Sequence, residues 1–179
     1  LSLNYRRIKV LTRPPKRQGR GMKIKNNPLA EFAIQHNLET FLPERPNDNR
    51  FLEKLAERKP DVLISSAYGK IMSEAFLNCF SLGNINIHPS LLPRWRGPSP
   101  IESTLLEGDN ITGVSLMQMT DELDAGPIYQ QESIQLSGEN SKTLSEKLSL
   151  LAADMLQKFL PVFLQGNSNP KHQDESLVT

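Results

Sequence analysis

Residues 84–101 read NINIHPSLLPRWRGPSPI, a short strand-like segment that runs directly into a proline-rich loop. The branched apolar residues of INIH at 85–88 predict a strand, and side chains two apart on a strand project to the same face. Asn86 and His88 would therefore lie together at the mouth of the loop. An amide beside an imidazole can stabilise an oxyanion, or His88 can act as acid or base while Asn86 fixes a carbonyl. The alternative is a structural histidine that closes the strand.

On both sides of this stretch, strand-like and helix-like segments alternate. The predicted strands are 7–12, 61–66, 85–88, 112–119 and 128–136. The predicted helices are 28–37, 49–59, one within 67–80, 101–107 and a long one with an apolar stripe from Leu144 to Phe159. This alternation predicts an α/β fold with a mostly parallel sheet flanked by helices, in which the last two strands pair antiparallel. Thr143 followed by Glu146 predicts a capping box for the long helix.

Ligands of such sheets bind beyond the carboxyl ends of the strands. That rule selects the segment after strand 61–66, the loop after INIH, and the turn DELDAGP at 121–127. In the turn, we interpret Asp121 and Glu122 as turn formers, because acidic residues cluster in turns for local hydrogen bonding. The same turn also holds Asp124.

Other site templates find no support in the sequence. There is no GxGxxG after a strand, no GxxxxGK[ST] and no GxSxG, which argues against dinucleotide, nucleoside triphosphate and nucleophile-elbow sites. His36, His88 and His172 are scattered along the chain with a single Cys79, so we expect no metal site. A lone cysteine indicates a reducing compartment, and we expect a cytoplasmic protein. No run approaches about 18 apolar residues, so we expect no membrane span.

Charge is distributed unevenly along the 179 residues. Residues 1–25 hold nine of the 21 Lys and Arg and none of the 20 Asp and Glu, so a segment of +9 precedes a body of −8 within a chain of net charge +1. Many of these cations lie in 13–27, where paired prolines and two glycines predict a flexible basic loop. A one-signed block is either a contact for a polyanion or a solvated tail without a partner.

Two stretches, 84–101 and TGVSLMQMTDELDAGPI at 112–128, together resemble the signature of the formyltransferases that use 10-formyltetrahydrofolate. The resemblance implies a Rossmann-like formyltransferase fold whose sheet binds folate, and it implies that Asn86, His88 and Asp124 are catalytic. In that chemistry an amine attacks the formyl carbon of the donor. Asn86 and a protonated His88 would stabilise the oxyanion, while Asp124 would orient His88 and help to move a proton, without a metal.

The resemblance also implies a binding site for the donor 10-formyltetrahydrofolate. Two segments of the chain would form this site, the first of them through its backbone groups. The matching residues are Ala67, Tyr68, Gly69 and Ile71 in the first segment, and Ser90, Leu91, Leu92 and Pro93 in the second.

Within the family, three regions are similar to the branch that formylates initiator methionyl-tRNA: SLLPRWRG at 90–97, the basic TRPPKRQGRGMK at 12–23, and KHQDESLVT at 171–179. The tRNA contacts implied are Lys16, Arg17, Arg20, Lys23, Arg94 and Arg96. Trp95 is expected beside the amine substrate, with a loop anchor as the alternative. The HPS at 88–90 and DELDAGP with its Pro127 are closer to the branch that acts on glycinamide ribonucleotide, and Glu102 stands where the tRNA branch often has Gln.

On this resemblance, residues 1–166 form the catalytic domain and 167–179 begin a linker to a further domain. The family's first strand and Gly-Thr-Pro loop would precede residue 1. We expect a monomer that formylates initiator methionyl-tRNA. The alternatives are formyl transfer to glycinamide ribonucleotide or another small amine, hydrolysis of formyltetrahydrofolate, and a non-catalytic RNA-binding module.

Overall fold

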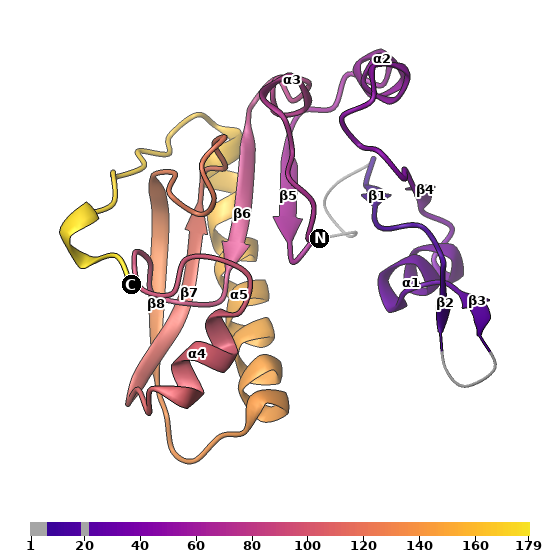
Figure 1. Cartoon of the computed structure of the whole chain (residues 1–179). Coiled ribbons are helices and arrows are strands. Elements are labelled where there is room, and N and C mark those ends of the chain that lie inside the picture. The colour runs from indigo at the N-terminus through magenta and orange to yellow at the C-terminus, as the bar shows by residue number, and fades with distance from the viewer. Residues whose placement is uncertain (1–6, 19–21) are drawn as a thin grey trace. The chain divides into compact units, whose positions relative to one another are not determined.

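The computed structural model of the chain describes residues 7–18 and 22–179, and Arg20 lies outside them. Its contacts divide it into two units, residues 1–54 and 55–179, with the division inside helix α2 (Asn49–Glu57). Figure 1 shows the helices and strands of each unit. Among the described residues, no helix is long and apolar enough to cross a membrane.

The first unit is built on a parallel strand pair and one helix. β1 (Lys9–Leu11) pairs with β4 (Glu39–Phe41), and α1 (Pro28–Gln35) lies between them in sequence. Asn27 caps α1 by accepting a hydrogen bond from the Ala30 backbone N–H at 3.0 Å, and a proline suits the first turn that follows. β1 and α1 confirm the predicted elements, whereas β4 falls in a stretch that the sequence showed only as polar.

The basic segment is not the irregular loop predicted from its prolines and glycines. β2 (Lys16–Gln18) and β3 (Lys23–Lys25) pair antiparallel, with Arg17 opposite Ile24. The prediction is wrong for these residues because ladder hydrogen bonds between the two short strands satisfy their backbones despite the flanking breakers. The pair is called the basic hairpin below.

The second unit contains a four-stranded sheet with the order β5-β6-β7-β8. Its strands are β5 (Leu63–Ser66), β6 (Asn84–His88), β7 (Ile111–Met117) and β8 (Ile128–Gln135). β5 and β6 are parallel, while β6–β7 and β7–β8 are antiparallel. The α/β class and the antiparallel pairing of the last two strands are confirmed. The sheet is mixed, because the strand after the 84–101 stretch returns in the opposite direction.

Three helices accompany this sheet: α3 (Glu74–Leu77), α4 (Pro100–Leu106) and α5 (Ser141–Leu164). α5 packs against β7 and α4 and runs along the sheet (Figure 1). The predicted stripe of α5 is buried at Leu144, Leu148, Met155 and Phe159. Its capping box is formed by Asn140 and Thr143 instead of Thr143 and Glu146, because the helix begins at Ser141, nearly one turn before the apolar stripe starts at Leu144.

After α5, the chain returns to the sheet. Lys171 and Ile128 exchange two backbone hydrogen bonds of 2.8 Å, and a short 3-10 helix follows at Glu175–Leu177. The segment that the sequence presents as a polar linker is therefore packed on the unit to which β8 belongs. Residues 171–179 are called the C-terminal segment below.

Candidate active site

His88 lies at the carboxyl end of β6, between parallel β5 and antiparallel β7, opposite Ser115. It is buried, with 4% of its surface exposed. Its Nε2 atom is 2.8 Å from the Trp95 carbonyl oxygen. A carbonyl can only accept, so this nitrogen carries the proton and donates. The other ring nitrogen, Nδ1, is 3.6 Å from Asp124 Oδ2. A protonated His88 ring would thus direct both of its N–H groups at acceptors.

Asn86 precedes His88 by two residues on β6, so the two side chains share a face of the strand. It is half-buried, and its neighbours across the sheet are Ser65 of β5 and Met117 of β7. The structure therefore places an amide beside the His88–Asp124 pair, as the spacing of the motif predicts.

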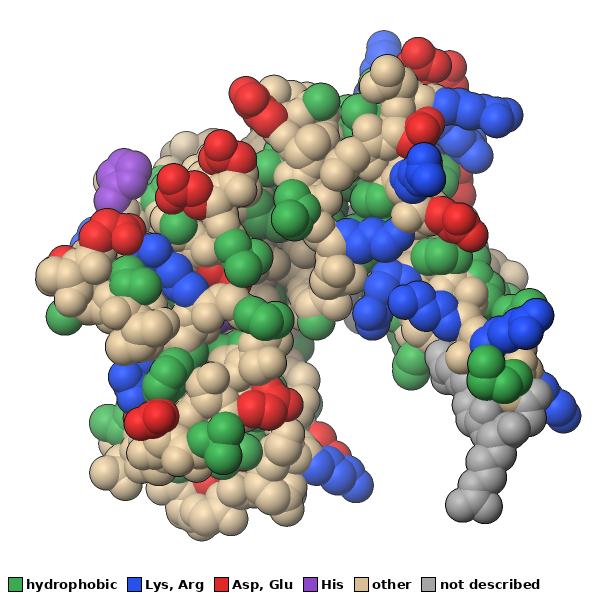
Figure 2. All heavy atoms as spheres, viewed as in Figure 1, with side chains coloured by type: hydrophobic (Ala, Val, Ile, Leu, Met, Phe, Trp, Pro, Cys, Tyr) green, Lys and Arg blue, Asp and Glu red, His purple; other side chains and the backbone are tan. Residues whose placement is uncertain are grey.

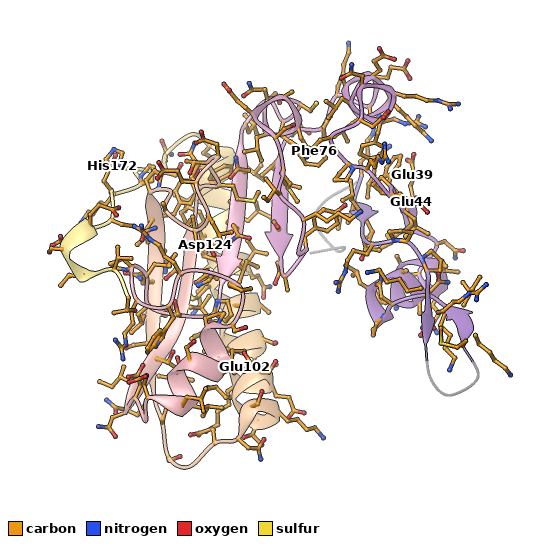
Figure 3. All side chains as sticks on the ribbon, in the orientation of Figure 1. Glu39, Glu44, Phe76, Glu102, Asp124 and His172 are labelled. Carbon is orange, nitrogen blue, oxygen red and sulfur yellow. The ribbon has the colours of Figure 1, made fainter. Side chains whose placement is uncertain are left out.

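Asp124 belongs to the turn between β7 and β8 (Figure 3). Its backbone is left-handed, with φ of 51°, and its Oδ2 atom accepts a 2.9 Å hydrogen bond from the Gly97 N–H. The turn closes tightly: Gln118 N–H donates to Pro127 O at 2.9 Å, and a Cβ atom at Gly126 would lie 1.9 Å from Gln118 O. Only glycine fits there, which explains the small residue in DELDAGP.

The loop after β6 is held in place by hydrogen bonds with polar side chains of β7 and β8 and within the loop. Ser115 of β7 donates to Ser90 O at 2.6 Å and accepts from the Leu92 N–H at 3.1 Å. Gln131 of β8 donates to Leu92 O at 2.9 Å. Ser90 itself donates to Arg94 O at 2.5 Å. Because these contacts satisfy the loop's polar groups inside the protein, the loop has a fixed conformation next to His88.

Arg94 and Trp95 form a second anchor of this loop on Asp109. The guanidinium donates to both carboxylate oxygens of Asp109, at 3.0 and 2.7 Å, and the Trp95 indole donates at 2.8 Å. The Arg94 guanidinium also stacks on the indole at 4.1 Å. The hydrogen bonds from Arg94, and then from Trp95, lower the pKa of Asp109 below its ordinary value of 3.8 although burial opposes the shift. Trp95 thus acts as a loop anchor, the alternative that the sequence left open.

Arg96 is paired with the C-terminal segment. It donates to Glu175 Oε1 at 2.7 Å and Oε2 at 3.1 Å, and to Gln173 Oε1 at 3.0 Å. The pairing with Arg96 lowers the pKa of Glu175. Arg94 and Arg96, which the resemblance assigned to tRNA, therefore carry intramolecular ion pairs.

The residues expected to bind folate lie on two loops that follow the neighbouring parallel strands β5 and β6. In the first loop Ala67 and Gly69 are exposed with left-handed backbones, Tyr68 is half-buried, and Ile71 is 77% exposed. In the second loop Ser90 and Leu92 are buried, while Leu91 and Pro93 are half-buried. Both loops lie beyond the carboxyl ends of their strands, where open sheets bind ligands.

The remaining predicted tRNA contacts are in the first unit. Lys16, Arg17 and Lys23 are exposed on the basic hairpin, and Arg20 lies outside the described residues. Over 7–18 and 22–179, no group of three or more His, Cys, Asp or Glu residues is arranged to hold a metal ion.

Sequence reasoning missed the residues that support the site, namely Ser115, Gln131, Asp109 and Gln173. Each makes contacts with residues at least 14 positions away in sequence. Local patterns carry no signal of such contacts.

Comparison with known proteins gives a consistent result. The family model described as formyl transferase matches residues 2–160. The methionyl-tRNA formyltransferase of Dictyoglomus thermophilum is 42% identical over 174 residues, which are 96% of this chain and 56% of that protein. The chain thus spans about half the length of the curated relatives it matches.

Two solved structures extend the comparison to the fold. A formyltransferase from Anoxybacillus kamchatkensis, in complex with UDP-4,6-dideoxy-4-formamido-L-AltNAc and tetrahydrofolate, has a TM-score of 0.66 at 22% identity, covering 93% of this chain and 82% of its own. Phosphoribosylglycinamide formyltransferase from Anaplasma phagocytophilum has a TM-score of 0.69 at 26% identity, covering 82% of this chain and 76% of its own.

Proposed function

Because the chain belongs to the formyl transferase family, we propose that the protein containing it transfers a formyl group from 10-formyltetrahydrofolate to the amino group of methionine on initiator methionyl-tRNA. The observation that carries the proposal is the His88–Asp124 pair, which lies at the carboxyl end of β6 beside Asn86. An acid–base pair next to an amide donor suits acyl transfer through a tetrahedral intermediate.

In this reaction the amine nitrogen attacks the formyl carbon, and the carbonyl electrons move onto the oxygen. Asn86 stabilises that oxyanion through its side-chain N–H, and a protonated His88 stabilises it through the positive charge of the ring, since both ring N–H groups face Trp95 O and Asp124 Oδ2. The amine then loses a proton, the oxyanion re-forms the carbonyl as the bond from the formyl carbon to the folate nitrogen breaks, and that nitrogen gains a proton. Asp124, whose Oδ2 atom faces His88 Nδ1, assists this proton movement through water. No covalent enzyme intermediate is required.

The donor is placed on the two loops at 67–71 and 90–93, which follow the parallel strands β5 and β6. A structural neighbour was solved with tetrahydrofolate, which supports a folate donor. The 90–94 loop, held by Ser115 and Gln131, would form this side of the donor site without reorganisation.

The acceptor is assigned from the curated relatives and from charge. Lys16, Arg17 and Lys23 are exposed on the basic hairpin, and exposed cations bind phosphates at low desolvation cost. In this role the +9 block of the sequence meets the tRNA backbone. A monomer in the cytoplasm remains our expectation.

The second candidate is transfer to glycinamide ribonucleotide or to another small amine. The structural likeness to phosphoribosylglycinamide formyltransferase and to a formyltransferase solved with a sugar nucleotide favours it. Such acceptors carry few phosphates and do not need a basic hairpin. Hydrolysis of the donor is the remaining alternative.

The test is to supply 10-formyltetrahydrofolate and one acceptor at a time to the complete protein that contains these residues. The acceptors are initiator methionyl-tRNA, glycinamide ribonucleotide, a nucleotide-linked amino sugar and water. We expect formyl transfer to the tRNA with kcat/KM falling steeply with salt, since three phosphate contacts give a log–log slope of about −2 to −3. Transfer to a small acceptor in preference to tRNA, without salt dependence, would contradict the assignment.

A further inference from the structure

The two loops that hold His88 both contain a residue with an unusual backbone. Trp95, whose carbonyl accepts the His88 Nε2 proton, has φ of 60°, and Asp124, whose carboxylate faces Nδ1, has φ of 51°. Residues other than glycine rarely adopt this left-handed region, and they stay there only when their surroundings enforce it. Some element outside the two loops must therefore hold them in place.

Ser115, Gln131 and Asp109 anchor the loop that contains Trp95, and the C-terminal segment adds contacts to both loops through Gln173. The side-chain amide nitrogen of Gln173 donates to the carbonyl oxygens of Asp124 and Gly126, both at 2.8 Å. Its carbonyl Oε1 accepts from Arg96 Nε at 3.0 Å. One side chain thus contacts both loops. The orientation of the amide follows from its neighbours, because carbonyl oxygens only accept and a guanidinium only donates.

These contacts close a ring of hydrogen bonds. Gln173 binds Arg96, and the next residue, Gly97, donates its N–H to Asp124 Oδ2 at 2.9 Å. The carbonyl of Asp124 returns to the Gln173 amide. The Asp124 oxygen within this ring is the same Oδ2 atom that faces His88. Any displacement of Gln173 therefore shifts the carboxylate relative to the imidazole.

We propose that Gln173 is a positioning residue, which sets the distance between Asp124 and His88 by locking the 94–97 loop onto the 121–127 turn. The expected effect of Gln173 on kcat rests on the proposed formyl transfer. Its effect on the distance between Asp124 and His88 does not. The position requires a neutral amide. A carboxylate at residue 173 would place an oxygen against two carbonyl oxygens, and a lysine could not accept the hydrogen bond from Arg96.

The segment that carries Gln173 is itself attached at both sides. Lys171 forms its backbone pair with Ile128, and the Thr179 hydroxyl accepts from the Trp95 N–H at 3.0 Å. The C-terminal segment therefore touches the backbones of both left-handed residues, Asp124 through Gln173 and Trp95 through Thr179. This arrangement couples the position of the segment to the geometry around His88.

The test is Gln173→Glu in the complete protein, which keeps the size of the side chain and its acceptor toward Arg96 but removes both donated hydrogen bonds. We expect kcat for formyl transfer to fall at least about tenfold with KM for both substrates within about twofold, since misplacing a catalytic group by about 1 Å can cost about 10²-fold. We also expect the NMR resonance of the Gly97 backbone amide to shift toward the value that it has in the Asp124→Ala variant. The reason is that Asp124 Oδ2, which accepts the hydrogen bond from this amide, is displaced.

His172→Ala is the matched control, because His172 is the exposed neighbour of Gln173 on the same segment and lies on the outer side of the unit (Figure 3). It should leave kcat and the Gly97 resonance unchanged. Gln173→Asn, which keeps the amide but shortens the reach, replaces Gln173→Glu if thermal melting shows that the latter does not fold. In a folded variant, a kcat within about twofold of wild type or an unmoved Gly97 resonance would overturn the proposal. If the wild type transfers no formyl group, the proposed function fails, and the Gly97 resonance alone decides the role of Gln173.

Discussion

Two groups of cations in the molecule differ in their partners: one group is bound to carboxylates and the other is exposed. Near the candidate site, Arg94 is paired with Asp109 and Arg96 with Glu175. On the basic hairpin, Lys16, Arg17 and Lys23 are exposed and, within the described residues, no ion pair involves them. Figure 2 shows blue side chains projecting from the part of the first unit that carries the hairpin.

This difference separates two tasks. A guanidinium with a carboxylate partner stabilises the protein's own loops, and a competing phosphate would first have to break that pair. An exposed lysine has no such partner to lose, so it gains more from a phosphate. Changes near the site should therefore act on kcat and on stability, and changes on the hairpin should act on KM for a polyanionic acceptor.

The largest effect is expected at the site itself. Asn86→Ala, His88→Ala and Asp124→Ala should each reduce formyl transfer by about 10² to 10⁴-fold, the range for an oxyanion donor or an acid–base group. The fold should survive, as judged by circular dichroism and thermal melting, although His88→Ala should lower the melting temperature because it empties a buried position. A rate like that of the wild type in any of the three would remove that residue from the chemistry.

A steric change in the 121–127 turn should come next. Gly126→Ala would bring a Cβ atom to 1.9 Å from Gln118 O, so the turn must open and Asp124 must move. We expect kcat to fall about 10² fold together with the melting temperature. The matched control is Gly138→Ala, where the added Cβ meets nothing within 4 Å although φ is 89°. It should lower stability by about 1 kcal/mol and leave kcat alone. Equal kcat in the two variants would show that the turn does not set the geometry of the site.

A smaller effect, confined to binding, is expected on the basic hairpin. Lys16→Ala combined with Arg17→Ala should raise KM for methionyl-tRNA about tenfold and reduce the log–log salt slope by about 2, with kcat unchanged. Arg94→Ala is the control that removes one cation from the paired region. It should leave the salt slope unchanged, and a reduced slope in this variant would mean that Arg94 also contacts the tRNA.

The smallest effect is expected in the loss of melting temperature at acid pH. Arg94 and Trp95 lower the pKa of Asp109 below its ordinary value of 3.8. A depressed carboxyl pKa adds stability that is present above the ordinary value and is lost as the pH falls below it. Asp109→Asn should therefore reduce the loss of melting temperature between pH 4 and pH 2, which differential scanning calorimetry at a series of pH values measures. If Asp109→Asn and the wild type lost the same melting temperature between pH 4 and pH 2, the Asp109 contacts would not persist in solution.

Much of the fold and the positions of the candidate site residues could be predicted because their signals are local. INIH, its following loop and DELDAGP each carry their information within a few residues, and Asn86, His88 and Asp124 are found where the motifs place them. The pairing of the last two strands follows from their alternation and the short turn between them.

The remainder depends on contacts that are distant in sequence. The basic hairpin looks like a loop because its prolines and glycines dominate the local pattern, while its strands are only three residues long. Gln173 lies 49 residues from Asp124, in a stretch whose polar composition is typical of a linker. The structural role of Arg94 is hidden as well, since its partner Asp109 is on the far side of α4 in sequence.

The most direct test of the account is a double-mutant cycle on formyl transfer from 10-formyltetrahydrofolate under single-turnover conditions. The proteins are wild type, His88→Ala, Asp124→Ala and the double variant, with initiator methionyl-tRNA as acceptor. If the two residues act as one unit, as the 3.6 Å approach of Nδ1 to Oδ2 indicates, the double variant should be no slower than the slower single variant. Rate losses that multiply in the double variant, or no loss in either single variant, would contradict it.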